Sequence, residues 1–171
     1  MWKYDGSERP PFADGPAAGQ ESVWDYPRPP AIRADSRRVR VLLGRHVIAD
    51  TREALRVLET ASAPTFYLPL ADVDAAALVP ARGVSLCEWK GAASYFDVSC
   101  AELHVARAAW SYLEPKPAFA AIAGHLAFYP ALLDCFVDGE RVRPQPGGYY
   151  GGWLTSEIVG PVKGEPGSGG W

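Results

Sequence analysis

Short alternating runs of β-prone residues, separated by turn residues, limit the fold of this chain more than any other feature of its sequence. Val39, Val41 and Leu43 alternate with two arginines, and Gly44-Arg45 then leads into a second apolar run, as in a β-hairpin. Asp138-Gly139 predicts another tight hairpin turn. Many short strands with regularly spaced turns indicate a mainly β fold, a compact antiparallel barrel or sandwich.

Two short helices are expected within this β framework. Residues 71–78 carry Asp72 and Asp74 in a first turn, where the positive end of the helix dipole favours carboxylates. Residues 118–122 form a further helical turn before a glycine. Residues 51–60 fit either a helix or a short strand, and that choice stays open.

The 16 prolines and 17 glycines gather at the two ends of the chain, which divides it into three parts. Residues 37–143 form the predicted mainly β core domain. Residues 1–36 form a Pro/Gly-rich N-terminal extension without strand or helix period, and residues 144–171 a Gly/aromatic-rich C-terminal extension. Trp24 and Tyr26 are expected to dock the N-terminal extension on the core, because disordered segments seldom keep large aromatic residues. The alternative is a disordered tail.

Charge and cysteine content narrow the classes of function. The formal net charge of −3 argues against a nucleic-acid-binding surface. Cys87, Cys100 and Cys135 are odd in number and form no C-x-x-C pair, which predicts reduced thiols, no disulfide and no structural metal. No apolar run approaches the length of a membrane span. We expect a soluble cytoplasmic protein with no cofactor and no membrane partner, whose exposed strand edges would permit a homodimer.

One stretch, Cys87-Glu88-Trp89-Lys90-Gly91, concentrates a thiol, a carboxylate, an indole and an ammonium before a flexible glycine. Lys90 is one of only four lysines, against thirteen arginines. Arginine serves a general need for positive charge, whereas lysine is a compact donor whose pKa responds to burial. We therefore expect Lys90 to line a concave aromatic pocket, with Glu59 or Glu88 as its charge partner. The predicted ligand-binding residues are Lys90, Glu59, Tyr95, Trp89, Phe66 and Trp110.

Four residues are candidates for catalysis in the same pocket: Lys90, Cys87, His104 and His125. A nearby ammonium lowers the pKa of a thiol, which makes Cys87 a candidate nucleophile. Histidine titrates near neutral pH and can act as a general acid or base. Structural alternatives stay open, with Cys87 as a buried apolar residue, Lys90 in an ion pair, and both histidines as structural side chains.

The central stretch continues into the pattern C-x-x-K-G-x-A-x-Y, which runs from Cys87 to Tyr95. Together with Ala49-Asp50, Tyr67-Leu68-Pro69 and Ala109-Trp110-Ser111-Tyr112, it resembles domain-of-unknown-function family 427, which occurs in bacteria and fungi. The resemblance covers roughly residues 37–143, and the flanks resemble a longer-tailed branch of the family. It implies a small, mainly β fold and no secure activity.

Members of this family are sometimes labelled nucleotidyltransferase-like. Such an enzyme needs a Gly-Ser loop on a helix and a D-x-D pair on a strand, which binds Mg²⁺ through carboxylates. Asp72-Val73-Asp74 has this spacing, but it lies in an expected helical turn with no Gly-Ser upstream, which favours helix capping. The label therefore finds no support in these residues.

These features favour a protein that binds a small organic molecule in an aromatic-lined pocket around residues 87–90. Whether it is an enzyme stays open, because one alternative uses the pocket for acid–base or nucleophilic chemistry. Another alternative is a protein-partner module through Trp24–Pro30, where aromatic anchors lie on a polyproline-like frame.

Overall fold

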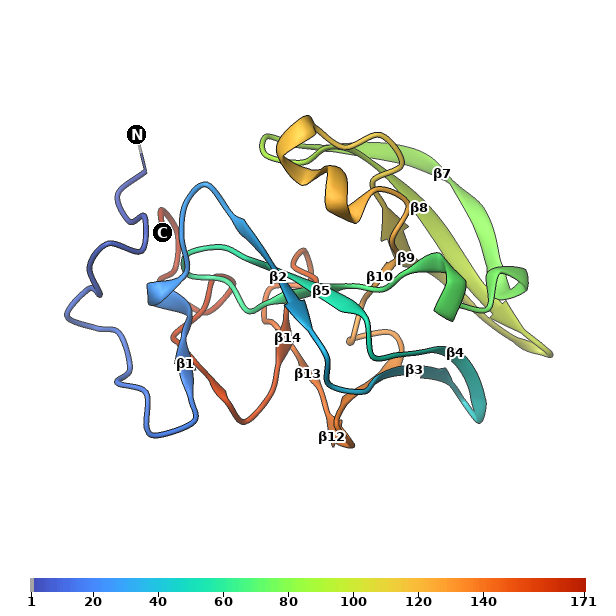
Figure 1. Ribbon diagram of the computed structural model, residues 1–171, viewed down its shortest axis with the longest axis horizontal. Coiled ribbons are helices and arrows are strands. Elements are labelled where there is room, and N and C mark those ends of the chain that lie inside the picture. Colours follow the sequence, from blue (N-terminus) through green and yellow to red (C-terminus); the bar gives the residue numbers. More distant parts are fainter. Residues whose placement is uncertain (1) are drawn as a thin grey trace.

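The computed structural model describes residues 2–171, which form a mainly antiparallel β structure with two extensions packed beside it (Figure 1). Three sheets of three or four strands carry the fold, and two short strand pairs order the extensions. None of these sheets closes on itself within the described residues. The prediction of a mainly β, antiparallel fold is confirmed, and of its two alternatives, barrel or sandwich, the barrel is wrong because no sheet closes.

The largest sheet contains the longest strands and supports the site described below. Its order is β10 (Ala127–Phe128), β9 (Leu103–Ser111), β8 (Gly91–Cys100) and β7 (Leu78–Cys87). All its neighbouring strands are antiparallel, and an irregularity between Pro80 and Val84 bends β7. The sequence predicts two strands over residues 93–99 and 102–110, joined at Cys100-Ala101, and both are confirmed as β8 and β9.

The second sheet consists of the two hairpins predicted from their turn residues. Its order is β12 (Glu140–Arg141), β11 (Asp134–Val137), β3 (Val39–Leu43) and β4 (His46–Thr51). Gly44 turns β3 into β4 with a φ of 58°, and Asp138 and Gly139 have φ angles of 46° and 81°. These turns need left-handed backbone, which glycine and aspartate adopt more readily than other residues.

The third sheet joins part of the N-terminal segment to the core. Its order is β2 (Ala31–Asp35), β5 (Ala54–Leu58) and β6 (Thr65–Tyr67). Strand β5 settles the choice left open for residues 51–60. The prediction of no strand within residues 1–36 is wrong for the short β1 (Glu21–Ser22) and for β2, which pairs with β5 along its whole length. This strand depends on a partner distant in sequence, and such pairing leaves little local signal.

Helical structure within residues 2–171 is limited to 3-10 segments. The helix expected over residues 71–78 does not form, because two separate turns, η2 (Leu70–Asp72) and η3 (Ala75–Ala77), lead into β7. Asp74 does cap the start of η3, as its side chain accepts a backbone N–H there. The longest segment, η4 (Pro117–Ile122), lies where a turn was expected, so one helix replaces the predicted two. None of these segments has the length and apolar character needed to cross a lipid bilayer.

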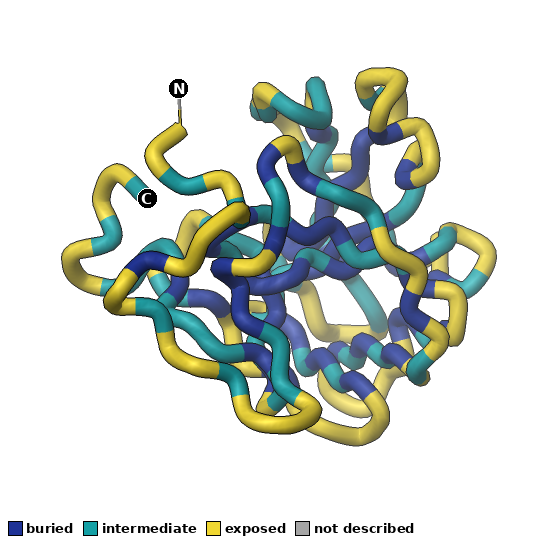
Figure 2. Tube along the Cα trace, turned by 60° about the vertical axis from the view of Figure 1, so that its left-hand side comes forward, coloured by how far each residue is buried: buried dark blue, intermediate teal, exposed yellow. Residues whose placement is uncertain are grey.

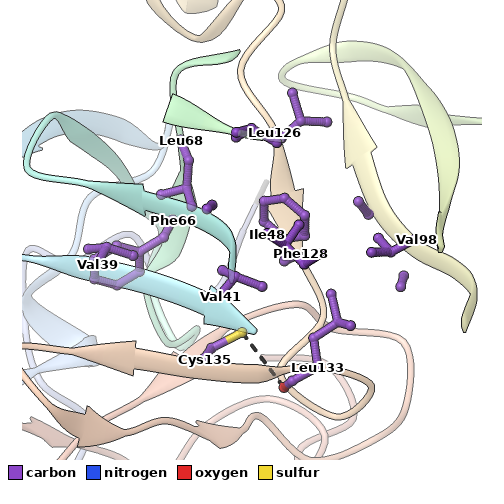
Figure 3. Packing of buried hydrophobic residues seen from close by; sticks show 14 of the residues in the cluster. Val39, Val41, Ile48, Phe66, Leu68, Val98, Leu126, Phe128, Leu133 and Cys135 are labelled. Atoms are coloured by element: carbon purple, nitrogen blue, oxygen red, sulfur yellow. Dashed lines mark hydrogen bonds between the residues drawn. The ribbon is translucent and has the colours of Figure 1, made fainter. Parts of the chain in front are cut away.

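The main core lies between the β7–β10 sheet and the two neighbouring sheets (Figure 3). Its buried side chains are mostly aliphatic, and they include Val39, Val41, Ile48, Leu68, Val98 and Leu126. Phe66 stacks on Trp153, with ring centroids 4.7 Å apart, and the indole N–H of Trp153 donates to the Phe128 carbonyl at 3.1 Å. A tryptophan from the C-terminal extension therefore completes this core.

The two extensions also pair with each other. Strand β1 (Glu21–Ser22) runs parallel to β15 (Ile158–Val159), while β13 (Arg143–Pro144) pairs with β14 (Trp153–Leu154). Trp24, in the turn η1 (Val23–Asp25), is fully buried and meets Trp171 edge to face at 5.2 Å. The two ends of the chain consequently lie close together (Figures 1 and 2), and buried segments of both reach into the body (Figure 2).

Candidate functional site

A cleft of about 1220 Å³ opens on the face of the β7–β10 sheet that is turned away from the main core. Strand alternation assigns the two faces. Tyr95 in β8 lies opposite Trp110 in β9, and both line the cleft. Phe96 and Ala109, one position along each strand, are paired on the other face and pack with the core.

Aromatic side chains form a continuous wall of this cleft. Trp110 contacts Tyr129 with ring centroids 4.4 Å apart, and Tyr67 of β6 meets Trp110 edge to face at 6.4 Å. Tyr112 lies next to Tyr67 at 6.3 Å. Such rings offer flat apolar surface together with hydroxyl groups that can form hydrogen bonds to a ligand.

The stretch from Cys87 to Gly91 is a tight turn that joins β7 to β8. Cys87 pairs with Gly91 across the ladder, and Gly91 has a φ of 102°, a conformation that favours glycine. The backbone N–H of Lys116 donates to the Lys90 carbonyl at 2.9 Å, and the ammonium of Lys116 donates to the Glu88 carbonyl at 2.6 Å. These bonds hold the turn in place at the mouth of the cleft, which it lines.

The ammonium of Lys90 faces aromatic rings and not a carboxylate. Its Nζ lies 5.7 Å from the ring centroid of Tyr112 and 6.0 Å from that of Phe119. Lys90 takes part in none of the ion pairs formed within residues 2–171. The neighbouring Trp89 has a buried indole N–H that finds no acceptor among the same residues. The turn thus presents a cation and an indole donor that the protein itself does not use.

Burial protects three phenols of the cleft from ionisation even at alkaline pH. It raises the pKa of Tyr67, Tyr112 and Tyr129 well above the usual value for tyrosine. Tyr95 shares a 2.7 Å hydrogen bond with the hydroxyl of Ser85, and the guanidinium of Arg107 lies 4.0 Å from its ring centroid. Because a neutral phenol can donate and accept, the aromatic wall is polar without being negatively charged.

The C-terminal extension forms the opposite side of the cleft. Gly151 lies directly on the indole of Trp110, where a Cβ atom would come within 2.1 Å of the ring. Gln145 fixes this segment, since its amide donates to the Lys163 carbonyl at 2.9 Å. The ammonium of Lys163 lies 5.0 Å from the ring centroid of Trp2, and burial lowers the pKa of this lysine.

The structure places six of the predicted site residues on this cleft: Cys87, Trp89, Lys90, Glu59, Tyr95 and Trp110. The two histidines lie elsewhere. His104 pairs with Asp97 at 3.1 Å, and its side chain is 52% exposed. His125 lies with its Nδ1 3.3 Å from the carbonyl oxygen of Ala123. Of the four candidates for catalysis, only Cys87 and Lys90 therefore reach the cleft.

The phase of each strand decides which aromatic residues face the cleft. In β6, Tyr67 takes this position and Phe66 is buried in the main core, so the expectation that Phe66 walls Lys90 is wrong. The alternation of β9 continues from Trp110 to Tyr112, which also lines the cleft. Tyr112 was not among the predicted site residues, although the alternation of β9 was a usable signal.

The expected charge partner of Lys90 is engaged elsewhere. Glu59 accepts a 3.3 Å ion pair from Arg28, whose side chain is 1% exposed and also donates to the Thr60 carbonyl. Glu88 is exposed and makes no ion pair within the described chain. The predicted pairing of Lys90 with either carboxylate is therefore wrong, because a buried arginine claims one and solvent surrounds the other.

Two further cations of the cleft, Arg107 and Lys163, were not predicted. Arg107 has a φ of 49° beside the irregularity in β9, and local sequence did not indicate that conformation. Lys163 comes from the C-terminal extension, and the repeat of a Lys-Gly pair at Lys90-Gly91 and Lys163-Gly164 was its only signal.

Asp72 and Asp74, which lie outside the cleft, both accept hydrogen bonds from nearby parts of the chain. Asp72 accepts a 2.7 Å hydrogen bond from the hydroxyl of Thr51, and Asp74 caps η3. No group of three or more His, Cys, Asp or Glu side chains within residues 2–171 has an arrangement suited to a metal ion. A hydrogen bond from Thr51 to Asp72 and a helix cap by Asp74 therefore account for the two carboxylates of the D-x-D pair. The three cysteines are free thiols.

The part of the chain that contains the β7–β8 turn also matches a known protein family. Residues 31–139 match the family described as domain of unknown function (DUF427). The chain belongs to this family. The DUF427 match extends from β2 to the β11–β12 turn and includes Cys87, Lys90 and Tyr95, whereas Gly151 and Lys163 lie beyond it. No curated protein matches the chain.

Proposed function

We propose that the cleft binds a small organic molecule with a flat apolar body and a negatively charged or strongly accepting group. The observation that carries this proposal is the pair of unused donors on the β7–β8 turn. Lys90 has no carboxylate partner, and the buried indole N–H of Trp89 has no acceptor within residues 2–171. A buried donor without a partner costs free energy, which the acceptor of a ligand would recover.

The charges around the cleft support an anionic ligand. Lys90, Arg107 and Lys163 line it, against Glu59 and Glu88. One of these two carboxylates is already paired with a buried arginine, which leaves an excess of positive charge. The rings of the concave aromatic wall exclude part of the water, which strengthens the attraction between such cations and an anion.

The aromatic wall supports a flat body for this ligand. Trp110 and Tyr129 present their rings side by side, and the neutral phenols add hydrogen-bonding groups at the edges. The cleft volume of about 1220 Å³ would accommodate a molecule of drug size together with bound water.

Native mass spectrometry of the protein purified from its own host tests this proposal. We expect a co-purified small molecule with the native chain and its loss in Lys90→Met, because methionine keeps the length of the side chain without its charge. Lys3→Met is the matched control, since Lys3 does not line the cleft, and this variant should keep the molecule. Equal retention by Lys90→Met, or no bound molecule in any sample, would contradict the proposal.

A catalytic use of the cleft is our second candidate, and Lys163 is the observation in its favour. Burial lowers the pKa of Lys163, which raises the fraction of neutral amine available as a base or nucleophile. Competitive labelling with acetic anhydride at neutral pH should then modify Lys163 faster than Lys3. A rate no higher than that of Lys3 would remove this candidate.

A partner module built on Trp24–Pro30 is not proposed, because its anchors are already occupied. Trp24 is fully buried, and Tyr26 is 5% exposed with its hydroxyl donating to Glu21 at 2.6 Å. A partner could reach these side chains only after the N-terminal extension had left the body.

A further inference from the structure

A second hollow, of about 240 Å³, lies on the core-facing side of the β7–β10 sheet, next to η2 and η3. Its wall is apolar and includes Leu70, Leu78, Phe96, Leu113 and Leu126, with no charged side chain from the described residues. Leu70 and Leu113 are 49% and 57% exposed, so the hollow opens to solvent beside them. This hollow is separate from the cleft and shares no lining residue with it.

One polar side chain, Ser111, lies in this apolar wall. Ser111 is 1% exposed, and its hydroxyl has no hydrogen-bond partner within residues 2–171. It is the last residue of β9, directly after Trp110, which faces the cleft. Strand alternation therefore directs Ser111 to the opposite side, where it lines the hollow. A buried hydroxyl without a partner is uncommon and needs a physical explanation.

We propose that this hollow binds a small uncharged molecule with an apolar body and one hydrogen-bonding oxygen that meets Ser111. The volume corresponds to about eight non-hydrogen atoms, if each takes the space of one water in the liquid. The ligand is uncharged because the wall has no countercharge and burial of an unpaired ion is costly. The serine hydroxyl both donates and accepts, so alcohols, ketones and amides share the required chemistry.

The test compares benzyl alcohol with ethylbenzene, two probes of the same size that differ by a hydroxyl in place of a methyl group. Binding to the full chain is followed by NMR of the leucine methyl groups. We expect saturable shifts at Leu70, Leu113 and Leu126, with benzyl alcohol bound about two- to tenfold more tightly. Equal affinities, or no saturable shift with either probe, would overturn the proposal.

Two variants keep the test independent of folding. Ser111→Ala removes an unpaired buried hydroxyl and should fold at least as well, while it abolishes the preference for benzyl alcohol. Ala75→Phe adds a ring at the exposed rim of the hollow and should weaken binding of both probes at least tenfold. A preference that survives Ser111→Ala, or shifts confined to the methyl groups of Leu86 and Leu132 in the cleft, would show that the hollow is not the site.

Discussion

The two faces of the β7–β10 sheet are formed by the same strands but differ in chemistry. The core face carries aliphatic residues and Phe128 and includes no tyrosine among the buried residues of its cluster. The cleft face carries Tyr95, Trp110 and Tyr112, of which the first is only partly covered. Outside the hollow beside Ser111, the core face therefore gains stability from apolar burial, while the cleft face keeps aromatic surface and hydroxyl groups available for binding.

This difference shows how one strand can serve stability and recognition together. Successive residues of β9 alternate between Ala109, which is fully buried in the main core, and Trp110, which lines the cleft. A substitution at adjacent positions should consequently have unlike effects.

The largest effect is expected from truncation on the core face. Phe128→Ala removes a fully buried ring and should lower the free energy of unfolding by about 3–5 kcal/mol, because a cavity remains. Tyr95→Ala, on the cleft face, should cost about 1 kcal/mol, since part of the Tyr95 side chain already faces the open cleft. Urea unfolding of both variants measures the difference. Equal losses would mean that both faces act as core.

A methyl group at Gly151 tests the contact between the C-terminal extension and the cleft face. Its Cβ would lie 2.1 Å from the Trp110 ring, so Gly151→Ala must displace this segment and should cost about 1–3 kcal/mol. Gly15→Ala is the control, because its Cβ would meet no atom within 4 Å, and it should change stability by less than about 0.5 kcal/mol. Thermal unfolding with Trp fluorescence follows both changes. If Gly151→Ala left the stability unchanged, the C-terminal extension would be only loosely held against Trp110.

Alkaline pH should weaken the cleft face through its buried phenols. Burial raises the pKa of Tyr112 in the folded state above its unfolded value near 10, so folding holds a proton that the unfolded chain releases. Stability is complete below pH 10 and falls as the pH rises above it, by up to about 1.4 kcal/mol per pH unit for each such phenol. Tyr112→Phe should make this decline shallower in urea titrations between about pH 9 and 11. An unchanged slope would mean that the phenol is not protected.

The smallest effect on stability is expected from Lys90→Met. Lys90 makes no ion pair within the described residues, and its distant ring contacts contribute little, so the free energy of unfolding should change by less than about 0.5 kcal/mol. Chemical denaturation at neutral pH measures this value. A loss above about 2 kcal/mol would show that the turn is structural and that Lys90 stabilises the fold, not ligand binding.

Local patterns in the sequence predicted a large part of the fold. The Gly44 and Asp138-Gly139 hairpins were predicted because turn residues specify their own backbone angles. Strands β8 and β9 followed from alternation next to Cys100. Strand β2 and the interruption of the expected helix at Val73, which bridges to Ala49 of β4, were not predicted, since both depend on pairing with distant parts of the chain.

The side of the cleft formed by the β7–β8 hairpin was predictable because its residues are also close together in the sequence. Trp89, Lys90 and Tyr95 lie within one hairpin, so their spacing in sequence carries over to space. The opposite wall comes from the C-terminal extension, and Lys163 reaches the cleft only through contacts that no short motif encodes. The error at Phe66 was one of strand phase, where a shift of one residue exchanges core and cleft.

The parallel pairing of β1 with β15 sets an order in time during synthesis. The indole N–H of Trp24 donates to the carbonyl of Pro161 at 3.1 Å, a residue made long after it. At ribosomal speeds, on the order of ten seconds separates the two residues. During that interval Trp24 can pack on Tyr4 and Phe12, which precede it, but not yet on Trp171. Complete burial of this indole therefore waits until the C-terminal extension has been made.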